Sequence, residues 1–572
     1  MNFWPALQQP VLLIIAFIAM LHTALLQAQD TQQNDSTGFL VVAADRGFVG
    51  NEEIRDAFAN FEQHHNAALV FVTDERTNLS LTSSLASLQN RGAKHVVVLP
   101  LFLSTSTPRY QLVRKLLIQK ESDLSLSFAR AYGKSYIAVE ELAGRMRATP
   151  SIAGQDLLIV GYGARDEASQ QGMQQDWEQI VHHAANGLDV QSIQTLILPE
   201  RGQDEDGEAY FKHIKQLLAT ALKSRSSTKA DKQFHVLPFA FGPRHDSMMS
   251  LEARLTWLLP EHAKLVDRPA DPKYLTTWMT REANRSQSLT PASTGVILFA
   301  HGSDFHWNEN LRTAVQPLME RYLVEFAFSM ADPGTIERAL RKLEQRGAKT
   351  AIIVSAYATG SSFRKEIEQL TGLDFENRRA GQTTPDNPGK HTDHGHHGKP
   401  GESPSRILTT LPVIFTGGYD DHPLFATALL DRALGLSKDP AKETVIVVAH
   451  GTKDDQRNLA WLNKLEGIAQ HMRHNGGQQF KAIQVATWRE DWPDKRAPWI
   501  EKVRNMVMEA SKHDGKAIVI PARTTATGPE KRFLAGLQFE LGSGFAPHPL
   551  FTQWVEEQIH QGMQQYAQAM NH

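Results

Sequence analysis

The sequence of 572 residues contains no cysteine. This absence excludes disulfide bonds, thiolate metal ligands and cysteine nucleophiles, so metal chemistry here depends on histidine, on carboxylates or on ligands that a substrate brings. The chain also lacks a strong charge of either sign, because 60 Lys and Arg residues face 63 Asp and Glu residues and the formal net charge is -3. Such a balance offers no field that would hold nucleic acid or an anionic membrane, and we predict no nucleic-acid partner.

Long hydrophobic runs are scarce, and the longest lies at the N-terminus. Residues 11–26 are almost entirely apolar, and Ala28 precedes the polar stretch DTQQNDSTG. The run is short for a transmembrane helix of about 20 residues, and no Lys or Arg precedes it. We interpret residues 1–28 as a signal peptide, with an uncleaved membrane anchor as the alternative. The mature chain is then expected to begin near Gln29, to have no membrane span and to be exported, most simply to the periplasm.

One pattern occurs four times along the rest of the chain. An apolar run ends in a turn of small residues, a helical stretch follows, and a second apolar run comes later. The openings are FLVVAADRG, LLIVGYGARD, VILFAHGSD and VIVVAHGTKDD, which begin near residues 38, 156, 294 and 443. Continuous runs of Val, Ile and Leu are typical of strands that helices cover on both faces, as in parallel sheets with right-handed crossovers. The repeat predicts an α/β fold of four half-modules, each a doubly wound parallel sheet.

The spacing of the repeats indicates two duplicated domains rather than a solenoid. We expect modules one and two to form a domain over residues 38–260, and modules three and four to form a second domain over residues 294–560. Residues 261–293 have mixed polarity and three prolines and are the predicted linker. Residues 377–405 are rich in Gly, Pro and His and are predicted to form a surface loop inside module three.

Histidine follows the opening strand in the third and fourth modules only. His301 and His450 are each preceded by Ala and followed by Gly, whereas Asp45 and Tyr162 occupy this position in the first two modules. Open α/β sheets bind ligands beyond the carboxyl ends of their strands, and Gly lets backbone approach a ligand closely. Neutral imidazole binds Co, Ni, Fe and Zn ions. Both histidines are candidate metal ligands, with a capping or hydrogen-bonding role as the alternative.

The order of motifs resembles that of the class II chelatases, the family of the small sirohydrochlorin and cobalt chelatases. The resemblance rests on AHGS after a strand, RGAK before the next strand, and GGYDDHPLF after a further loop, with a second HPLF near the C-terminus. It covers nearly all of the chain after the N-terminal segment. It implies two α/β lobes around a cleft in which a divalent ion, Co, Ni, Fe or Zn, enters a tetrapyrrole without ATP. It also implies that His301 and His450 are the catalytic residues and bind the metal.

Several positions depart from the pattern of that family. The histidine expected in the loop after the second strand has a counterpart only in module two, where His245 follows GPR and is a further candidate ligand. Met330 stands where the family has a glutamate, with Asp332 two residues later, whereas Glu490 is available in module four. Such losses would impair turnover while leaving a binding cleft intact.

Four more histidines cluster in the predicted surface loop. They lie within seven residues, and they are His391, His394, His396 and His397. Flexible imidazoles rearrange around a divalent ion without preformed geometry, so this tract is predicted to capture metal. A solvated low-complexity loop is the alternative.

Two functions follow from these patterns. One is a chelatase of the sirohydrochlorin type that acts through His301 and His450 in the second domain. The other is a non-catalytic protein that binds or carries metal or a tetrapyrrole outside the cytoplasm. The predicted export favours the second function, because sirohydrochlorin, the substrate that the resemblance implies, is made in the cytoplasm.

Overall fold

The chain forms two compact units. The computed structural model describes residues 36–45, 47–74, 76–120, 123–201, 205–223, 234–239, 251–266, 271–377, 405–525 and 527–570. Unit 1 comprises Met1–Gln287 and Pro400–Thr410, and unit 2 comprises Ser288–Lys399 and Leu411–His572. The chain therefore enters unit 2, returns briefly to unit 1, and then completes unit 2.

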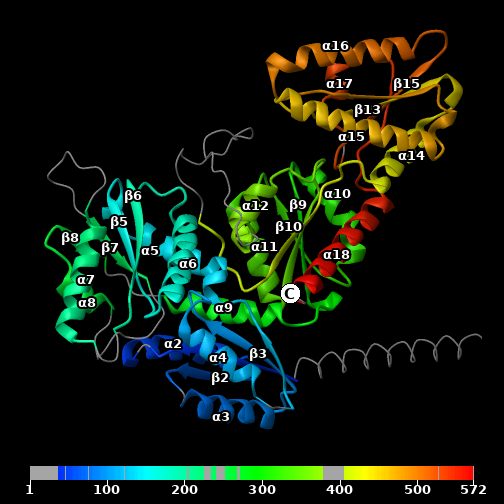
Figure 1. The fold of residues 1–572 in the computed structure, drawn as a ribbon. Coiled ribbons are helices and arrows are strands. Elements are labelled where there is room, and N and C mark those ends of the chain that lie inside the picture. Colours follow the sequence, from blue (N-terminus) through cyan, green and yellow to red (C-terminus); the bar gives the residue numbers. More distant parts are fainter. Residues whose placement is uncertain are drawn as a thin grey trace, which may run out of the picture. The chain divides into compact units, whose positions relative to one another are not determined.

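Each unit contains two four-stranded sheets, and all four sheets are parallel (Figure 1). Unit 1 has the orders β2-β1-β3-β4 and β6-β5-β7-β8, and unit 2 has β10-β9-β11-β12 and β14-β13-β15-β16. The strands of unit 1 are β1 (Thr37–Ala44), β2 (Ala67–Val72), β3 (His95–Leu101), β4 (Ser125–Phe128), β5 (Asp156–Tyr162), β6 (Ser192–Leu198), β7 (Phe234–Pro238) and β8 (Ala263–Leu265). Those of unit 2 are β9 (Thr294–Ala300), β10 (Leu323–Phe328), β11 (Thr350–Ser355), β12 (Val413–Gly417), β13 (Glu443–Ala449), β14 (Ala482–Thr487), β15 (Lys516–Pro521) and β16 (Glu540–Leu541). The predicted fold of four parallel half-modules is confirmed.

Helices cover both faces of these sheets, as the continuous apolar strands require. Those of unit 1 are α2 (Gly47–Glu62), α3 (Thr77–Asn90), α4 (Pro108–Ile118), α5 (Tyr136–Arg147), α6 (Glu167–Ala185), α7 (Gly207–Ala221), α8 (Leu251–Leu258) and α9 (Pro272–Arg285). Those of unit 2 are α10 (Phe305–Val315), α11 (Pro333–Gln345), α12 (Arg364–Thr371), α13 (Leu373–Glu376), α14 (Pro423–Leu436), α15 (Asp455–His474), α16 (Pro493–Ala510), α17 (Glu530–Phe533) and α18 (Pro549–Met570).

Strand β13 shows how the sequence sets this layering. Val445 and Val447 belong to one hydrophobic core, whereas Ile446 and Val448 belong to another core that includes Val503 of α16. Because side chains alternate across a strand, an unbroken apolar run supplies both cores at once. Figure 1 shows α16 and α15 on opposite sides of this strand.

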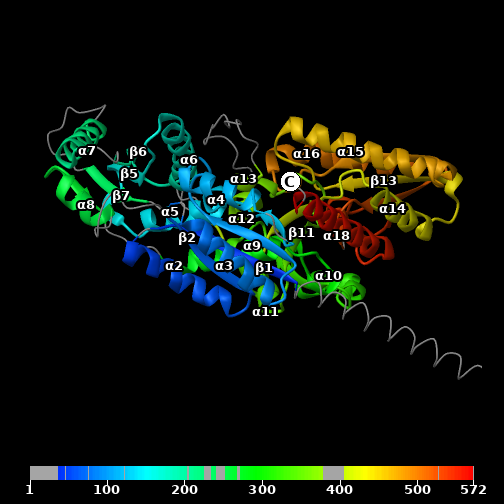
Figure 2. The same ribbon diagram turned by 60° about the horizontal axis from the view of Figure 1, so that its bottom comes forward.

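The two modules of unit 2 exchange their last helices. Helix α14 follows module three but packs on β15 and α15 of module four, and α18 follows module four but packs on β11, β12 and α10 of module three. The two helices also pack on each other (Figure 2). The exchange joins both lobes through one hydrophobic core that contains residues of both modules.

The two HPLF motifs start these exchanged helices in the same way. The Nδ1 atom of His422 accepts from the amide of Leu424 at 3.2 Å, and Nδ1 of His548 accepts from Leu550 at 3.2 Å. Each histidine lies 3.6 Å from an acid on the other helix, His422 from Glu557 and His548 from Asp431. The pairs are reciprocal, so they mark a local pseudo-twofold relation between the two lobes.

The stretch that we predicted to be a linker contains a structural helix of unit 1. Helix α9 packs against α2 of module one, whereas α5, which follows module one, packs against α6 of module two. Leu275, Trp278 and Met279 of α9 are buried, at the spacing of one helix face. The prolines were misleading, because Pro272 occupies the first turn of the helix, where proline is favoured. The linker prediction for residues 261–293 was therefore wrong for this helix.

Residues 405–410 form a strap on unit 1. Ile407 and Thr409 are 5% and 1% exposed. The Tyr136 hydroxyl donates to the carbonyl of Ile407 at 2.8 Å and accepts from the amide of Thr409 at 3.2 Å. The end of the predicted loop at 377–405 is thus followed directly by a buried segment.

Several predictions concern residues outside the described ranges. These are the signal peptide at 1–28, His245, and most of the histidine-rich loop, with His391, His394, His396 and His397. They stay predictions. In the described ranges, every helix is too short or too polar to cross a bilayer.

Candidate metal centre

The two AHG turns in unit 2 have the same geometry. His301 follows β9 and His450 follows β13, and the glycine after each histidine has a left-handed φ, 76° at Gly302 and 83° at Gly451. The Nδ1 atom of each imidazole lies near the carbonyl oxygen of that glycine, at 2.6 Å for His301 and 2.8 Å for His450. Because a carbonyl only accepts, Nδ1 carries the proton and Nε2 is the nitrogen that points to a ligand.

An amide side chain from the following helix closes each turn. The amide of Ser303 donates to Asn308 at 3.1 Å, and that of Thr452 donates to Asn458 at 3.2 Å. A side chain at position 451 would place its Cβ 2.8 Å from the Asn458 carbonyl oxygen, so the turn requires glycine. The sequence thus fixes the backbone that presents both histidines.

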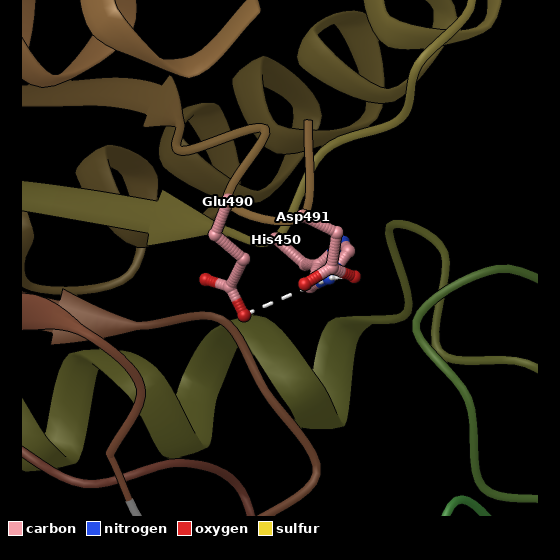
Figure 3. Close-up of side chains that lie close together, drawn as sticks. All are labelled: His450, Glu490 and Asp491. Atoms are coloured by element: carbon pink, nitrogen blue, oxygen red, sulfur yellow. Dashed lines mark hydrogen bonds and ion pairs between the residues drawn. The ribbon is translucent and has the colours of Figure 1, made fainter. Parts of the chain in front are cut away.

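His450 lies beside two carboxylates from the loop that follows the neighbouring strand β14 (Figure 3). Its Nε2 atom is 2.8 Å from Asp491 Oδ2 and 3.6 Å from Glu490 Oε1. One ligand atom from each of the three residues lies within 4.8 Å of the others. An imidazole and two carboxylates are donors that suit Co, Fe, Ni and Zn ions. We call His450, Glu490 and Asp491 the carboxylate-histidine cluster.

The hydrogen bonds of His450 place a proton where an ion would bind. Both ring nitrogens of His450 face acceptors, the Gly451 carbonyl and Asp491, so the imidazole holds both protons. Burial acts to lower the pKa of His450, but the hydrogen bond to Asp491 and the charge of Glu490 outweigh it and raise this pKa above 6.5. The hydrogen bond to His450 lowers the pKa of Asp491, and the charges of Arg523 and His301 act in the same direction. An ion must therefore displace a proton from His450.

Arg489 fixes the loop that presents the two carboxylates. It has a φ of 51°, which is unusual for a residue other than glycine. Its buried guanidinium donates to the carbonyls of Thr452 and Lys453 and to Asp455. The loop after β14 is thereby tied to the turn after His450.

Two tryptophans stand beside the cluster. The Trp461 ring is nearly parallel to the His450 ring at a centroid distance of 6.4 Å, and the Trp492 ring is perpendicular to it at 5.6 Å. Both indoles are only partly buried. They give the cluster an apolar wall that restricts water around the imidazole.

The corresponding edge of module three is chemically different. His301 is exposed, and its charge still contributes to lowering the pKa of Asp491, so the two lobes act on the same region of unit 2. Met330 follows β10 and is 47% exposed. Asp332 accepts from the amide of Thr335 as the N-cap of α11. Among the described residues, a group of three donors is found at the edge of module four and none at the edge of module three.

The corresponding residues of unit 1 have structural roles. Asp45 accepts from the amide of Gly47 at 2.9 Å and from the Asn51 side chain at 2.7 Å. Tyr162 is 4% exposed and belongs to the core of module two.

Asp491 is the site residue that the sequence analysis missed. Glu490 was noted as an available acid, but its neighbour was not. The signal was an acidic pair directly after a strand next to the AHG strand, since parallel neighbours end at one edge of a sheet.

The chain is similar in sequence to known chelatases. No known family profile matches the chain. Sirohydrochlorin cobaltochelatases of Saccharolobus islandicus and Saccharolobus solfataricus are 32% identical to it over 88 residues, which cover 15% of this chain and 69% of each relative.

Two solved structures are also similar. DR2241 of Deinococcus radiodurans, a multi-domain protein described as similar to chelatases, has a TM-score of 0.29 and 17% identity, over 47% of this chain and 54% of that one. SirB of Bacillus subtilis with Fe3+ has a TM-score of 0.30 and 14% identity, over 44% of this chain and 95% of that one. Because the chain is 32% identical to the Saccharolobus relatives over 69% of their length, it belongs to the class II chelatase family.

Proposed function

We propose that unit 2 inserts a divalent metal ion into a tetrapyrrole of the sirohydrochlorin type. The observation that carries this proposal is the carboxylate-histidine cluster at the carboxyl edge of the module-four sheet. The ion is the substrate and, by the donor set, is Co, Ni, Fe or Zn. The Saccharolobus relatives are named as cobaltochelatases of sirohydrochlorin, which makes this macrocycle and Co(II) the first pair to test.

The cluster has the groups that insertion requires. His450 and the two carboxylates can hold the ion, and a set with one nitrogen donor releases it readily to the four nitrogens of a macrocycle. Two pyrrole N–H protons must leave as the ion enters. Glu490 and Asp491 are bases within reach of the same ion and can accept these protons.

His301 would take part in the same insertion reaction from module three. Its Nε2 atom is free of the glycine carbonyl that holds Nδ1, and the ring is exposed. An exposed imidazole can bind the incoming ion or take a proton from the macrocycle. The resemblance to the family assigned both histidines to catalysis, and we keep this assignment as part of the proposal.

Metal or tetrapyrrole binding without turnover is the second candidate. One observation favours it: Met330 stands where the family resemblance implies a glutamate, and the described residues at this edge form no group of three metal donors. A carrier of this kind would suit an exported protein, as the N-terminal segment predicts. The two candidates share the metal site and differ only in turnover.

The test is the absorbance change when purified full-length protein is mixed with sirohydrochlorin and Co(II). We expect metalation faster than the spontaneous reaction, and His450→Ala to slow it at least about tenfold, since one of few protein ligands is lost. His474→Ala is the control, because His474 is an exposed histidine of α15 that bonds only its own helix. If the protein binds both substrates but metalation proceeds only at the spontaneous rate, the carrier function is favoured.

A further inference from the structure

Glu490 divides its two carboxylate oxygens between the cluster and an arginine. Oε1 faces Nε2 of His450 at 3.6 Å, and Oε2 forms an ion pair with Nη2 of Arg523. Both side chains are mostly buried, at 16% and 19% exposure. Only one oxygen of Glu490 is therefore free to bind an ion while the arginine pair persists.

Arg523 is itself held from behind by a second acid. Its Nε atom lies 3.9 Å from Oε1 of Glu530, which is completely buried. Glu530 accepts from the indole of Trp488 at 3.2 Å and from the amide of Gly528 at 2.5 Å. Because two donors fix Glu530, its negative charge stands at a set place behind the guanidinium.

The backbone at Gly528 lies directly against the guanidinium of Arg523. A Cβ atom at Gly528 would lie 2.4 Å from Arg523 Cζ. The main chain of Arg523 is anchored as well, since its carbonyl accepts from the amide of Phe545 at 2.9 Å. These contacts do not touch the cluster, so they point to a requirement for the guanidinium at this place.

We infer that Arg523 is a positioning residue that limits Glu490 to one metal-binding oxygen and thereby keeps the bound ion labile. A chelatase must give up its ion to the macrocycle, and a carboxylate whose charge is shared with a guanidinium holds a cation more weakly. Loss of the arginine would leave Glu490, Asp491 and Glu530 without their shared counter-charge. The ion would then bind more tightly and leave more slowly. This inference rests on the metal-binding part of the proposed function.

The test uses the whole chain without residues 385–400, so that the loop histidines bind no metal. In this background, Arg523→Gln is compared with protein that keeps Arg523. Co(II) affinity is measured by calorimetry, and release is followed as transfer to a colorimetric chelator. We expect Arg523→Gln to bind Co(II) about tenfold more tightly and to release it about tenfold more slowly. Arg523→Lys, which restores the charge, should return both values most of the way to wild type.

Two further variants make the result specific. Glu530→Gln frees the guanidinium to pair with Glu490 alone, so Co(II) affinity should fall about threefold, opposite to the effect of Arg523→Gln. Arg321→Gln removes an ion pair with Glu556 on α18 and should leave both values unchanged.

The outcomes separate the two proposals. If wild type binds Co(II) and Arg523→Gln binds it equally or more weakly, Arg523 is only part of the scaffold and the inference is wrong. If Arg523→Gln fails to fold, Glu530→Gln decides, and an unchanged or tighter affinity overturns the inference. If wild type does not bind Co(II) at all, the proposed function fails as well.

Discussion

At the scale of single residues, the two AHG histidines differ in what surrounds them. His450 shares its site with two carboxylates, whereas the ring of His301 bonds the carbonyl of the following glycine and belongs to no such group among the described residues. The same motif therefore has unequal partners in the two modules. Metal affinity should depend mainly on module four.

We expect His450→Ala to weaken Co(II) or Ni(II) binding by at least tenfold, about 1.4 kcal/mol. His301→Ala should have a smaller effect, because it removes one exposed donor. The affinities are measured by calorimetry on protein lacking residues 385–400. If neither substitution changes the affinity, the AHG histidines are structural and their assignment as metal ligands is wrong.

The proton on His450 gives metal binding a definite pH dependence. The pKa of His450 is raised, so the proton competes with the ion at a higher pH than at an ordinary histidine. Affinity for Co(II) should fall as pH decreases through this raised value, beginning above pH 6.5. Asp491→Asn removes the main contact that raises the pKa and should move the fall to lower pH. Calorimetry in buffers of different ionisation enthalpy counts the protons released, and a pH-independent affinity would contradict the assignment.

At the scale of elements, the exchanged helices α14 and α18 depend on neutral histidines. Burial lowers the pKa of both His422 and His548, against the opposing charges of Glu557 and Asp431. Each ring uses Nδ1 as an acceptor for the first turn of its helix, which a doubly protonated ring cannot do. Since each folded pKa lies below the unfolded value, this stabilisation is present above pH 6.5 and is lost as pH falls through the folded pKa.

We therefore expect unit 2 to lose stability below pH 6.5. Loss of one cap costs about 1 kcal/mol, or about 2–4 °C in Tm. The double variant His422→Asn, His548→Asn keeps an acceptor at both positions and should unfold with a weaker pH dependence between pH 7.5 and 5.5. Scanning calorimetry measures this, with His474→Asn as the surface control. An equal pH dependence in wild type and double variant would exclude the caps as its cause.

The strands were more predictable than the helices that join the modules. Val445 to Val448 are apolar without interruption, and such a run fits only a strand buried on both faces. Helix α9 was hidden, because its buried side chains include Arg281 and Glu282, which read as surface residues. The exchange of helices between modules also has no local signal, since it depends on contacts far apart in sequence.

The same difference between local and long-range contacts explains which parts of the site could be predicted. The AHG turns are local, and each needs only a strand, a glycine and an amide cap. The cluster joins His450 to Asp491, which are 41 residues apart and meet only because β13 and β14 pair in parallel. The ion pair of Arg523 with Glu490 also requires the end of a third strand, β15, to lie at the same edge, and it was not predicted.

At the scale of the whole molecule, function is expected to reside in one unit. Asp45 and Tyr162 hold the turn and the core in unit 1, and neither is available as part of a three-donor group among the described residues. Asp45→Asn should leave Co(II) affinity within twofold of wild type, since the amide can still accept from Gly47. Calorimetry under the conditions used for His450→Ala checks this. A tenfold loss would show that unit 1 takes part in binding.

The strap makes unit 1 dependent on a late part of the chain. The Tyr136 hydroxyl satisfies both the carbonyl of Ile407 and the amide of Thr409. Tyr136→Phe should destabilise unit 1 by about 1–3 kcal/mol, because two buried backbone groups each lose a hydrogen bond. Urea unfolding should show this loss in the transition of unit 1, while Co(II) affinity stays unchanged. Full stability in the variant would mean that the strap contributes little.

The strap also imposes an order on synthesis. Unit 1 is continuous up to Gln287, but its last segment ends at Thr410, which the ribosome reaches 123 residues later (residues 288 to 410). At about 5–20 residues per second, this interval lasts roughly 6–25 s. During this interval the Tyr136 hydroxyl, which later bonds Ile407 and Thr409, lacks these partners on the nascent chain. Residues 288–399 of unit 2 are made in the same interval, so part of unit 2 is synthesised before unit 1 is complete.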